Sequence, residues 1–292
     1  MHKFLKSVGF SMCRREKDIK AVLRTLARDP ASVRYYQLDY DTTICEIKCE
    51  VAPGIGVAIY GEMDERDDME IEYYYPYLES SEVSSSEYCT LQRHIDRETF
   101  AGMLEEYKVG LSLIFYLLNP LEYRQKKQKQ GSRIMVESVC LSGLASEGII
   151  ILPVQKSARQ IEKAKVAAAN RNSLIRAAEG GDESAMETLS FDDYELYNSI
   201  SRRMETEDIY SIVDTSLMPS GLESDQYAIL GEITEVSKKE NRFTHETVYD
   251  LRVVCNDINF RIGINENDLL GEPLPGRRFK GKFWLQGNAN FA

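Results

Sequence analysis

Apolar residues recur at helical spacing near the start of the chain. Their separations of three and four residues place them on one stripe of an α-helix. The stripe consists of Ile19, Val22, Leu23, Leu26 and Ala27. Asp29 and Pro30 follow, and a proline disfavours the helical conformation in the residue before it. The pattern predicts an amphipathic helix that ends near residue 29.

Apolar and polar residues then alternate, which is the pattern of β-strands with one buried face. The predicted strands cover residues 33–40, 43–51, 55–61, 69–77 and 87–92. Pro53 and Gly54 are expected to form the turn between the second and third strands. Cys45 and Cys49 fall on the inward face of the second strand, opposite its charged residues. The segment predicts an antiparallel meander.

The middle of the chain contains both helical spacing and strand-like alternation of apolar residues. Phe100, Met103, Leu104 and Tyr107 lie at helical spacing, which predicts a second amphipathic helix. An apolar strand is expected at residues 111–118, followed by a basic loop and by strands near 133–142 and 147–153. The serines and glycines of residues 142–148 predict a hairpin turn between these last two strands.

Residues 157–205 have a helical pattern. Ser157 with Gln160, and Ser190 with Asp193, resemble capping boxes, in which side chains satisfy the free N–H groups of a helix start. A pair of glycines at residues 180–181 is expected to end the first helix, and the aspartate that follows can cap the next one. We therefore expect a helical connector.

Strand-like segments return in the last part of the chain. They cover residues 227–233, 248–255, 259–264 and 278–286, with a helical turn near 267–270. About five strands with a short helix before the last one are compatible with an OB-like topology, as with other small barrels. The predicted fold class is α+β. An α+β sheet domain with an N-terminal antiparallel sheet and helices covers residues 1–155, the helical connector covers 156–206, and a small β-barrel domain covers 207–292.

The charge of the chain is negative and unevenly distributed. The formal net charge of -11 disfavours binding to nucleic-acid phosphates or to anionic membranes. Residues 111–180 carry a net charge of +6 and residues 181–224 carry -9. Blocks of opposite sign favour docking of a protein partner or of a second copy of the chain.

The sequence also bears on the cellular compartment. The first residues lack the apolar stretch of a signal peptide, and the most apolar run, at 109–118, is shorter than the about 20 residues of a membrane-spanning helix. The cysteines are scattered, which favours reduced and buried thiols. They are Cys13, Cys45, Cys49, Cys89, Cys140 and Cys255. We expect a cytoplasmic protein without a membrane partner.

The local motifs of catalysis and cofactor binding are absent from the sequence. His2, His94 and His245 lie far apart, without the spacing of metal ligands. Gly54 and Gly56 lack the third glycine and the helix of a dinucleotide-binding loop. We therefore predict no catalytic residue, no cofactor and no metal ligand. An enzyme site formed by carboxylates and tyrosines from distant positions stays open, because such sites need not be local.

Two strands carry candidate interaction surfaces. Tyr73, Tyr75 and Tyr77 share one strand face, where they either pack in the core or form a stacking surface for a partner.

The last strand places Arg278, Lys280, Lys282 and Trp284 on one face. Cations beside an exposed indole are typical of proteins that bind single-stranded nucleic acid. The alternative is that the helical connector covers Trp284. The net charge of -1 for residues 225–292 also disfavours a nucleic-acid partner.

Four segments of the chain resemble an uncharacterised family of Clostridia-type bacterial proteins. They are residues 1–6, 208–214, 225–232 and 276–281. The resemblance implies a cytosolic bacterial protein, a domain of unknown function, with no assigned activity, cofactor or catalytic residue.

These observations leave three functional hypotheses. The first is a non-enzymatic binding or regulatory protein that acts through protein–protein contacts, including self-association. The second is single-stranded nucleic-acid binding through the C-terminal barrel. The third is an enzyme with a non-local site of carboxylates and tyrosines.

Overall fold

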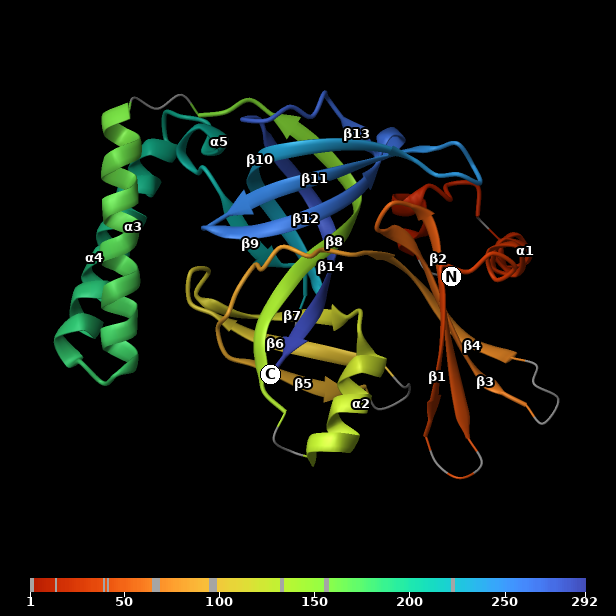
Figure 1. Cartoon of the computed structure of the whole chain (residues 1–292). Coiled ribbons are helices and arrows are strands. Elements are labelled where there is room, and N and C mark those ends of the chain that lie inside the picture. The colour runs from red at the N-terminus through yellow and green to blue at the C-terminus, as the bar shows by residue number, and fades with distance from the viewer. Residues whose placement is uncertain are drawn as a thin grey trace.

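The chain folds into two β-sheets and a helical hairpin that extends from them (Figure 1). The computed structural model describes residues 3–13, 15–38, 40, 42–64, 69–94, 99–131, 134–154, 158–221 and 224–292. In this part of the chain the structure is mixed α and β, with helices as the minor component.

The smaller sheet contains the first four strands of the predicted antiparallel meander. The fifth predicted strand, at residues 87–92, belongs to the larger sheet instead. Its strands pair in the order β1 (Ser32–Gln37), β2 (Thr43–Ala52), β3 (Ile55–Met63) and β4 (Met69–Leu78). The 3-10 helix η1 (Lys3–Val8) and helix α1 (Glu16–Leu26) contribute to the same hydrophobic core. The predicted first helix is confirmed, and Ile19, Leu23 and Leu26 of its stripe are buried.

The larger sheet combines strands from both halves of the chain. They are β5 (Cys89–Arg93), β6 (Phe100–Glu106), β7 (Leu111–Leu117), β8 (Val136–Ile151), β9 (Ser216–Pro219), β10 (Gln226–Glu240), β11 (Thr247–Cys255), β12 (Ile258–Asn265), β13 (Leu269–Leu270) and β14 (Arg278–Phe291). Strand β8 pairs with β14 over nearly its whole length and also with β12. Strands β12, β11, β10 and β14 pair in succession. Because these strands lie on both sides of the helical segment, the division into three domains stays a prediction.

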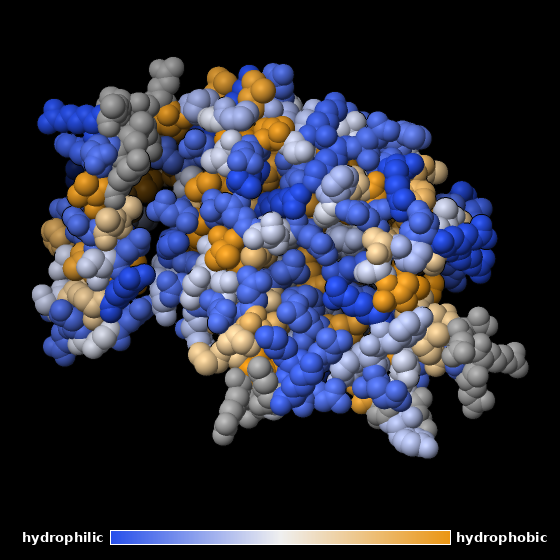
Figure 2. Space-filling model, in the orientation of Figure 1, coloured by the Kyte–Doolittle hydropathy of each residue, from blue (hydrophilic) through white to orange (hydrophobic). Residues whose placement is uncertain are grey.

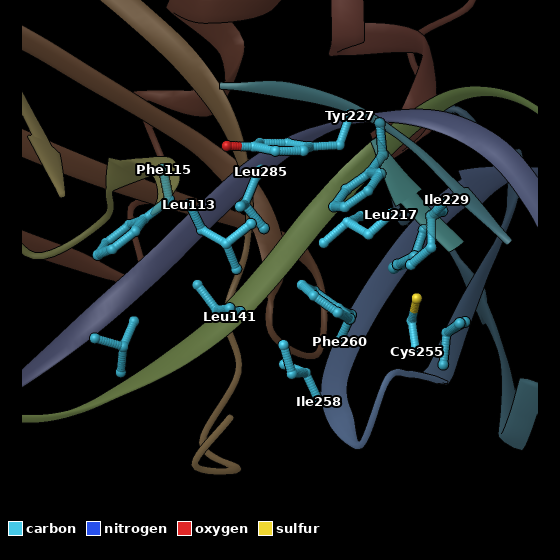
Figure 3. Packing of buried hydrophobic residues seen from close by; sticks show 14 of the residues in the cluster. Leu113, Phe115, Leu141, Leu217, Tyr227, Ile229, Cys255, Ile258, Phe260 and Leu285 are labelled. Carbon is cyan, nitrogen blue, oxygen red and sulfur yellow. The ribbon is translucent and has the colours of Figure 1, made fainter. Parts of the chain in front are cut away.

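The interior of the larger sheet is apolar. Figure 3 shows side chains from β7 to β14 that point toward one another, including Phe115, Leu141, Tyr227, Phe260 and Leu285. All five are buried. This burial stabilises the sheet through the removal of apolar surface from water.

The remaining helices lie between or beside the strands. They are α2 (Pro120–Gln130), α3 (Ala158–Glu179), α4 (Glu183–Met204), α5 (Ile209–Ile212) and the 3-10 helix η3 (Glu266–Asp268). Helices α3 and α4 form the hairpin. The expected cap at the start of α4 is confirmed, because the Asp182 side chain accepts a hydrogen bond from the backbone N–H of Ala185 at 3.2 Å.

The predicted second helix is wrong, because residues 100–106 form strand β6. Strand β6 pairs with β5 and β7. Phe100, Leu104 and Glu106 lie on its buried face, at the even spacing of a strand. Cross-strand pairing therefore outweighed a helical spacing of only four apolar residues.

The predicted hairpin turn at residues 142–148 is also wrong, because β8 continues through it. The ring of Phe283 packs on Gly143, where an added Cβ would lie 2.2 Å from a ring carbon, and the ring of Phe279 packs on Gly148 in the same way, at 2.4 Å. Glycines inside a strand mark such close approaches as well as turns.

Two further local predictions need correction. The basic segment that was expected to form a loop is largely helix α2. This helix starts with Pro120, and proline is favoured as the first residue of a helix. The last basic residue of the segment, Arg133, lies outside the described residues. The capping box at Ser190 does not start a helix, because α4 is continuous there and the Ser190 hydroxyl donates to the Met186 carbonyl. Ser157 also lies outside the described residues.

Candidate binding groove

A groove of about 660 Å³ crosses the outer face of the larger sheet. It runs over β13, β8, β14, β10 and β9, and helix α5 lies at one side of it. We call it the lysine groove, and define it by Glu147, Ile149, Tyr210, Met218, Leu270, Lys280 and Lys282.

The strand register places one row of groove residues side by side. Leu270 of β13 pairs with Ile149 of β8, which pairs with Lys280 of β14. Lys280 pairs with Leu230 of β10, which pairs with Ser216 of β9. Directly paired residues project from the same face of a sheet. Lys280 therefore lies between apolar side chains on both neighbouring strands.

A second row runs parallel to the first, two residues along each strand. Lys282 pairs with Glu147 on one side and with Ala228 on the other, and Ala228 pairs with Met218. The Lys282 Nζ lies 3.7 Å from the Glu147 carboxylate, and both side chains are largely exposed. An exposed ion pair of this kind contributes little stability. Lys282 can therefore exchange Glu147 for another anion at low cost.

Helix α5 is held in place by the last strand. Arg278 donates from its guanidinium to the backbone carbonyls of Tyr210, at 2.7 Å, and of Val213, at 2.9 Å. Lys280 donates to the Tyr210 hydroxyl oxygen. Asp208 caps the helix by accepting from the Tyr210 N–H at 2.7 Å. These contacts fix the Tyr210 ring at the side of the lysine groove.

The apolar parts of the groove are accessible. Met218 is 58% exposed and Leu270 is 67% exposed. Lys280 and Lys282 are two residues apart on one strand, so their Cα atoms are about 7 Å apart. An anionic group placed between them would accept hydrogen bonds from both ammonium groups, and apolar groups of the same ligand would contact the flanking strands.

The structure separates the four residues that the sequence placed together in the last strand. Only Lys280 and Lys282 line the groove. Arg278 is buried and bonds backbone carbonyls, and Trp284 is 4% exposed. The ring of Phe4 stacks on Trp284 at 5.7 Å, and Tyr116 lies 5.0 Å away. The N-terminal segment and a strand of the larger sheet, rather than the helical connector, thus pack on the indole, which presents no stacking surface.

The three tyrosines of β4 lie in the core. Tyr73, Tyr75 and Tyr77 are all buried. Tyr60 of β3 stacks on Tyr73, with ring centres 4.8 Å apart, and its hydroxyl lies 3.3 Å from that of Tyr75. Burial raises the pKa of both Tyr60 and Tyr75 well above the ordinary value for a phenol. These phenols are therefore protonated in the folded protein.

A carboxylate joins this tyrosine cluster, although the sequence pattern predicted that it would face away from the core. Glu46 of β2 accepts a hydrogen bond from the Tyr60 hydroxyl at 2.7 Å and is buried, as is Lys48. Both faces of β2 are therefore covered. Glu46 and Tyr60 are each at most 2% exposed, so a substrate in solution does not reach them in this conformation.

The described residues show neither a metal-site cluster nor a membrane-spanning helix. Within the described ranges, no three His, Cys, Asp or Glu side chains gather as a metal site would require. In the same part of the chain, every helix is too short or too polar to cross a membrane.

Sequence reasoning identified the two lysines but missed their apolar neighbours. Tyr210, Met218 and Leu270 lie on elements of four, four and two residues. Such short elements carry no detectable period. The aspartate at position 208, a favoured helix cap, was the one local signal for α5.

Comparisons with known proteins identify one relationship. A family described as "Domain of unknown function, E. rectale Gene description (DUF3881)" matches residues 5–287. The search of curated proteins found no match. The search of solved structures found none either.

Proposed function

We propose that this chain, which belongs to the DUF3881 family of unknown function, is a non-enzymatic binding protein that acts through protein–protein contacts at the lysine groove. The observation that carries the proposal is the pair of cross-strand rows that place two lysines beside apolar residues. Lys280 lies between Ile149 and Leu230, and Lys282 lies between Glu147 and Ala228. The cysteines Cys49, Cys89 and Cys255, which are buried and not disulfide-bonded, are in keeping with a cytoplasmic location.

The groove chemistry defines the partner segment. A segment with one Asp or Glu beside Leu, Ile, Met or Phe places its carboxylate between Lys280 and Lys282. Its apolar side chains then cover Ile149, Met218 and Leu270, which are among the exposed apolar residues of the protein. Such contacts contribute affinity because apolar surface leaves water and because charge-assisted hydrogen bonds form.

The surrounding strands support a finer description of the fold. Strands β8, β12, β11, β10 and β14 pair successively, and β14 pairs again with β8. We propose that these five strands form a small OB-like barrel that the chain enters at β8. The 3-10 helix η3 precedes the last strand, as the short helix of that topology does. The lysine groove would then lie on the outer wall of this barrel.

A selection from a library of random displayed peptides tests the function. The full-length chain is expected to enrich peptides that carry an acidic residue next to large apolar residues. Those peptides should lose at least about tenfold in affinity for the variant Lys280→Glu with Lys282→Glu, or about 1.4 kcal/mol. A matched double variant, Lys127→Glu with Lys129→Glu on exposed positions of α2, should bind like the parent.

Three outcomes count against the proposal. One is that no peptide is enriched, and another is that the enriched peptides bind the groove variant and the parent equally. The third is that dodecanoate or labelled single-stranded oligonucleotides bind in the groove while peptides do not. This last result would assign the groove to a small acid or to nucleic acid instead of a protein partner.

A further inference from the structure

The helical hairpin exposes an apolar face that the rest of the described chain does not cover. Helices α3 and α4 have 22 residues each, which makes each about 33 Å long. In Figure 1 they extend at one side of the two sheets, and Figure 2 shows hydrophobic side chains among the hydrophilic ones on this part of the surface. A helix that exposes an apolar stripe in this way is typical of one that packs on a partner.

Four of the exposed apolar residues of α4 form a stripe along the helix, whereas Phe191 and Leu196, also exposed, lie on other sides of it. Met186, Tyr194, Tyr197 and Met204 fall within about 80° of one another when successive residues are about 100° apart. All four are exposed, from 46% for Met186 to 70% for Tyr197. Tyrosine and methionine are enriched in protein–protein interfaces relative to other surface residues. We call these four residues the α4 stripe.

The charges along α4 indicate which partner fits the α4 stripe. The first two thirds of α4 carry only acidic charges, from Glu183 to Glu195, and its last turn carries Arg202 and Arg203. When two copies of this helix pack antiparallel, the acidic part of each lies beside the arginines of the other. A two-fold axis near the middle of the helix produces this arrangement, because the same patch then meets itself.

We infer that the α4 stripe is a self-association surface, on which α4 of a second copy of this chain packs antiparallel to form a four-helix bundle with both α3 helices. The helix pair within one chain already shows the electrostatic attraction that such a bundle uses. Arg171 of α3 lies 2.7 Å from Asp193 of α4. The inference is independent of the lysine groove, because no residue of α4 lines that groove.

Light scattering after size-exclusion chromatography, from about 1 μM to about 100 μM protein, tests the inference. The parent chain should be a dimer at the upper end of this range. The variant Tyr194→Glu with Tyr197→Glu should be a monomer, because it places four acidic groups at the two-fold axis. The matched variant Thr188→Glu with Ser199→Glu adds the same charge on the opposite face of α4 and should remain dimeric.

A crosslinking experiment supplies a second readout that does not depend on charge. Tyr197 lies close to the middle of the stripe, so Tyr197→Cys should form an intermolecular disulfide under mild oxidation, whereas Thr188→Cys should not. Circular dichroism checks that each variant keeps its helix content. A monomeric parent at every concentration overturns the inference, as does a stripe variant that stays dimeric or a Tyr197→Cys variant that does not crosslink.

Discussion

Trp284 donates its indole N–H to the carboxylate of Asp225, with 2.6 Å between Nε1 and Oδ2. Burial raises the pKa of Asp225, and the hydrogen bond from Trp284 offsets this only in part. The carboxylate is therefore hydrogen-bonded to the indole, but its burial disfavours the ionised form. The pair joins the start of β10 to β14 beside the aromatic contacts of Phe4 and Tyr116.

The Asp225 pair predicts different outcomes for two substitutions. Asp225→Ala leaves the buried indole N–H without this acceptor and should lower the free energy of unfolding by about 1–3 kcal/mol. Asp225→Asn keeps an acceptor and removes the buried charge, so it should cost less than the alanine variant. Urea unfolding near pH 7 measures both.

The pH dependence of the same pair has a definite sign. Because the folded-state pKa of Asp225 is raised, the folded protein binds more protons than the unfolded chain between the two pKa values. The unfolding free energy of the parent, relative to Asp225→Asn, should therefore fall as the pH rises from about 4. If the unfolding free energy of the parent rose relative to that of Asp225→Asn as the pH increased from about 4, the environment of Asp225 would favour the ionised carboxylate.

The contribution of a second carboxylate, Asp250, to the free energy of unfolding should depend on pH in the opposite sense. Burial by itself raises the pKa of Asp250, but hydrogen bonds from Arg261 and Lys239 outweigh it, so the pKa lies below the ordinary value. The Asp250 Oδ2 lies 2.6 Å from Arg261 Nη2 and 2.7 Å from Lys239 Nζ. Asp250 therefore stabilises the fold fully above the ordinary pKa of about 4. This stabilisation is lost as the pH falls through the lowered pKa of the folded state.

The corresponding variant is Asp250→Asn, which leaves the two cations without their charged partner. We expect its unfolding free energy to be lower by about 3 kcal/mol near neutral pH, with a smaller difference in acid. Glu240→Gln changes an exposed carboxylate that pairs with His245, and should stay within about 0.5 kcal/mol of the parent. Equal effects of the two variants would contradict the account of this cluster.

The packing of β14 on β8 can be tested at Gly148. A Cβ at this position would lie 2.4 Å from a ring carbon of Phe279. Gly148→Ala should therefore lower the free energy of unfolding by about 1–3 kcal/mol through overpacking. Gly221 has room for a Cβ, with 3.6 Å to its nearest neighbour, so Gly221→Ala is the control. If both variants unfold at the same urea concentration, the strands do not pack as described.

The cysteines provide a test of the two cores together. All of them are buried, and burial raises the thiol pKa to about 11 for Cys49 and to about 12 for Cys89 and Cys255. Thiol reactivity follows the thiolate form and its exposure. Ellman's reagent should therefore label the native protein slowly and the denatured protein fully. Fast labelling of a native thiol would reveal an opening of the core around it.

Sequence reasoning succeeded where the pattern is local. The stripe of α1 at Ile19, Leu23 and Leu26 and the alternation that predicted β1 to β4 depend on neighbours within a few residues. The structure has this helix and these strands, although both faces of β2 are buried. Phe100 and Leu104 fit a helix and a strand equally well by spacing. Only the pairing of their strand with β5 and β7 decides between the two.

The features that sequence reasoning missed depend on contacts between distant parts of the chain. Phe4 stacks on Trp284 across nearly the full length of the sequence, so the burial of the indole has no local signal. Lys280 and Lys282 were identified from strand alternation. Their neighbours Ile149 and Leu270 became part of the same site only through the pairing of β8, β13 and β14.

The apolar and the charged parts of the lysine groove should respond differently to substitution. Met218→Ser with Leu270→Ser should weaken binding of a selected peptide by removing apolar contact, and leave its salt dependence unchanged. Lys280→Gln with Lys282→Gln should weaken both the binding and its salt dependence, because exposed charges are screened by salt. Fluorescence anisotropy at two salt concentrations separates these effects.

The most direct test of the proposed function is an anisotropy titration of one labelled selected peptide against three proteins. These are the parent chain, Lys280→Glu with Lys282→Glu, and the matched control Lys127→Glu with Lys129→Glu. The account predicts that the groove variant alone binds at least about tenfold more weakly, which corresponds to about 1.4 kcal/mol. Equal affinity for all three proteins would contradict it.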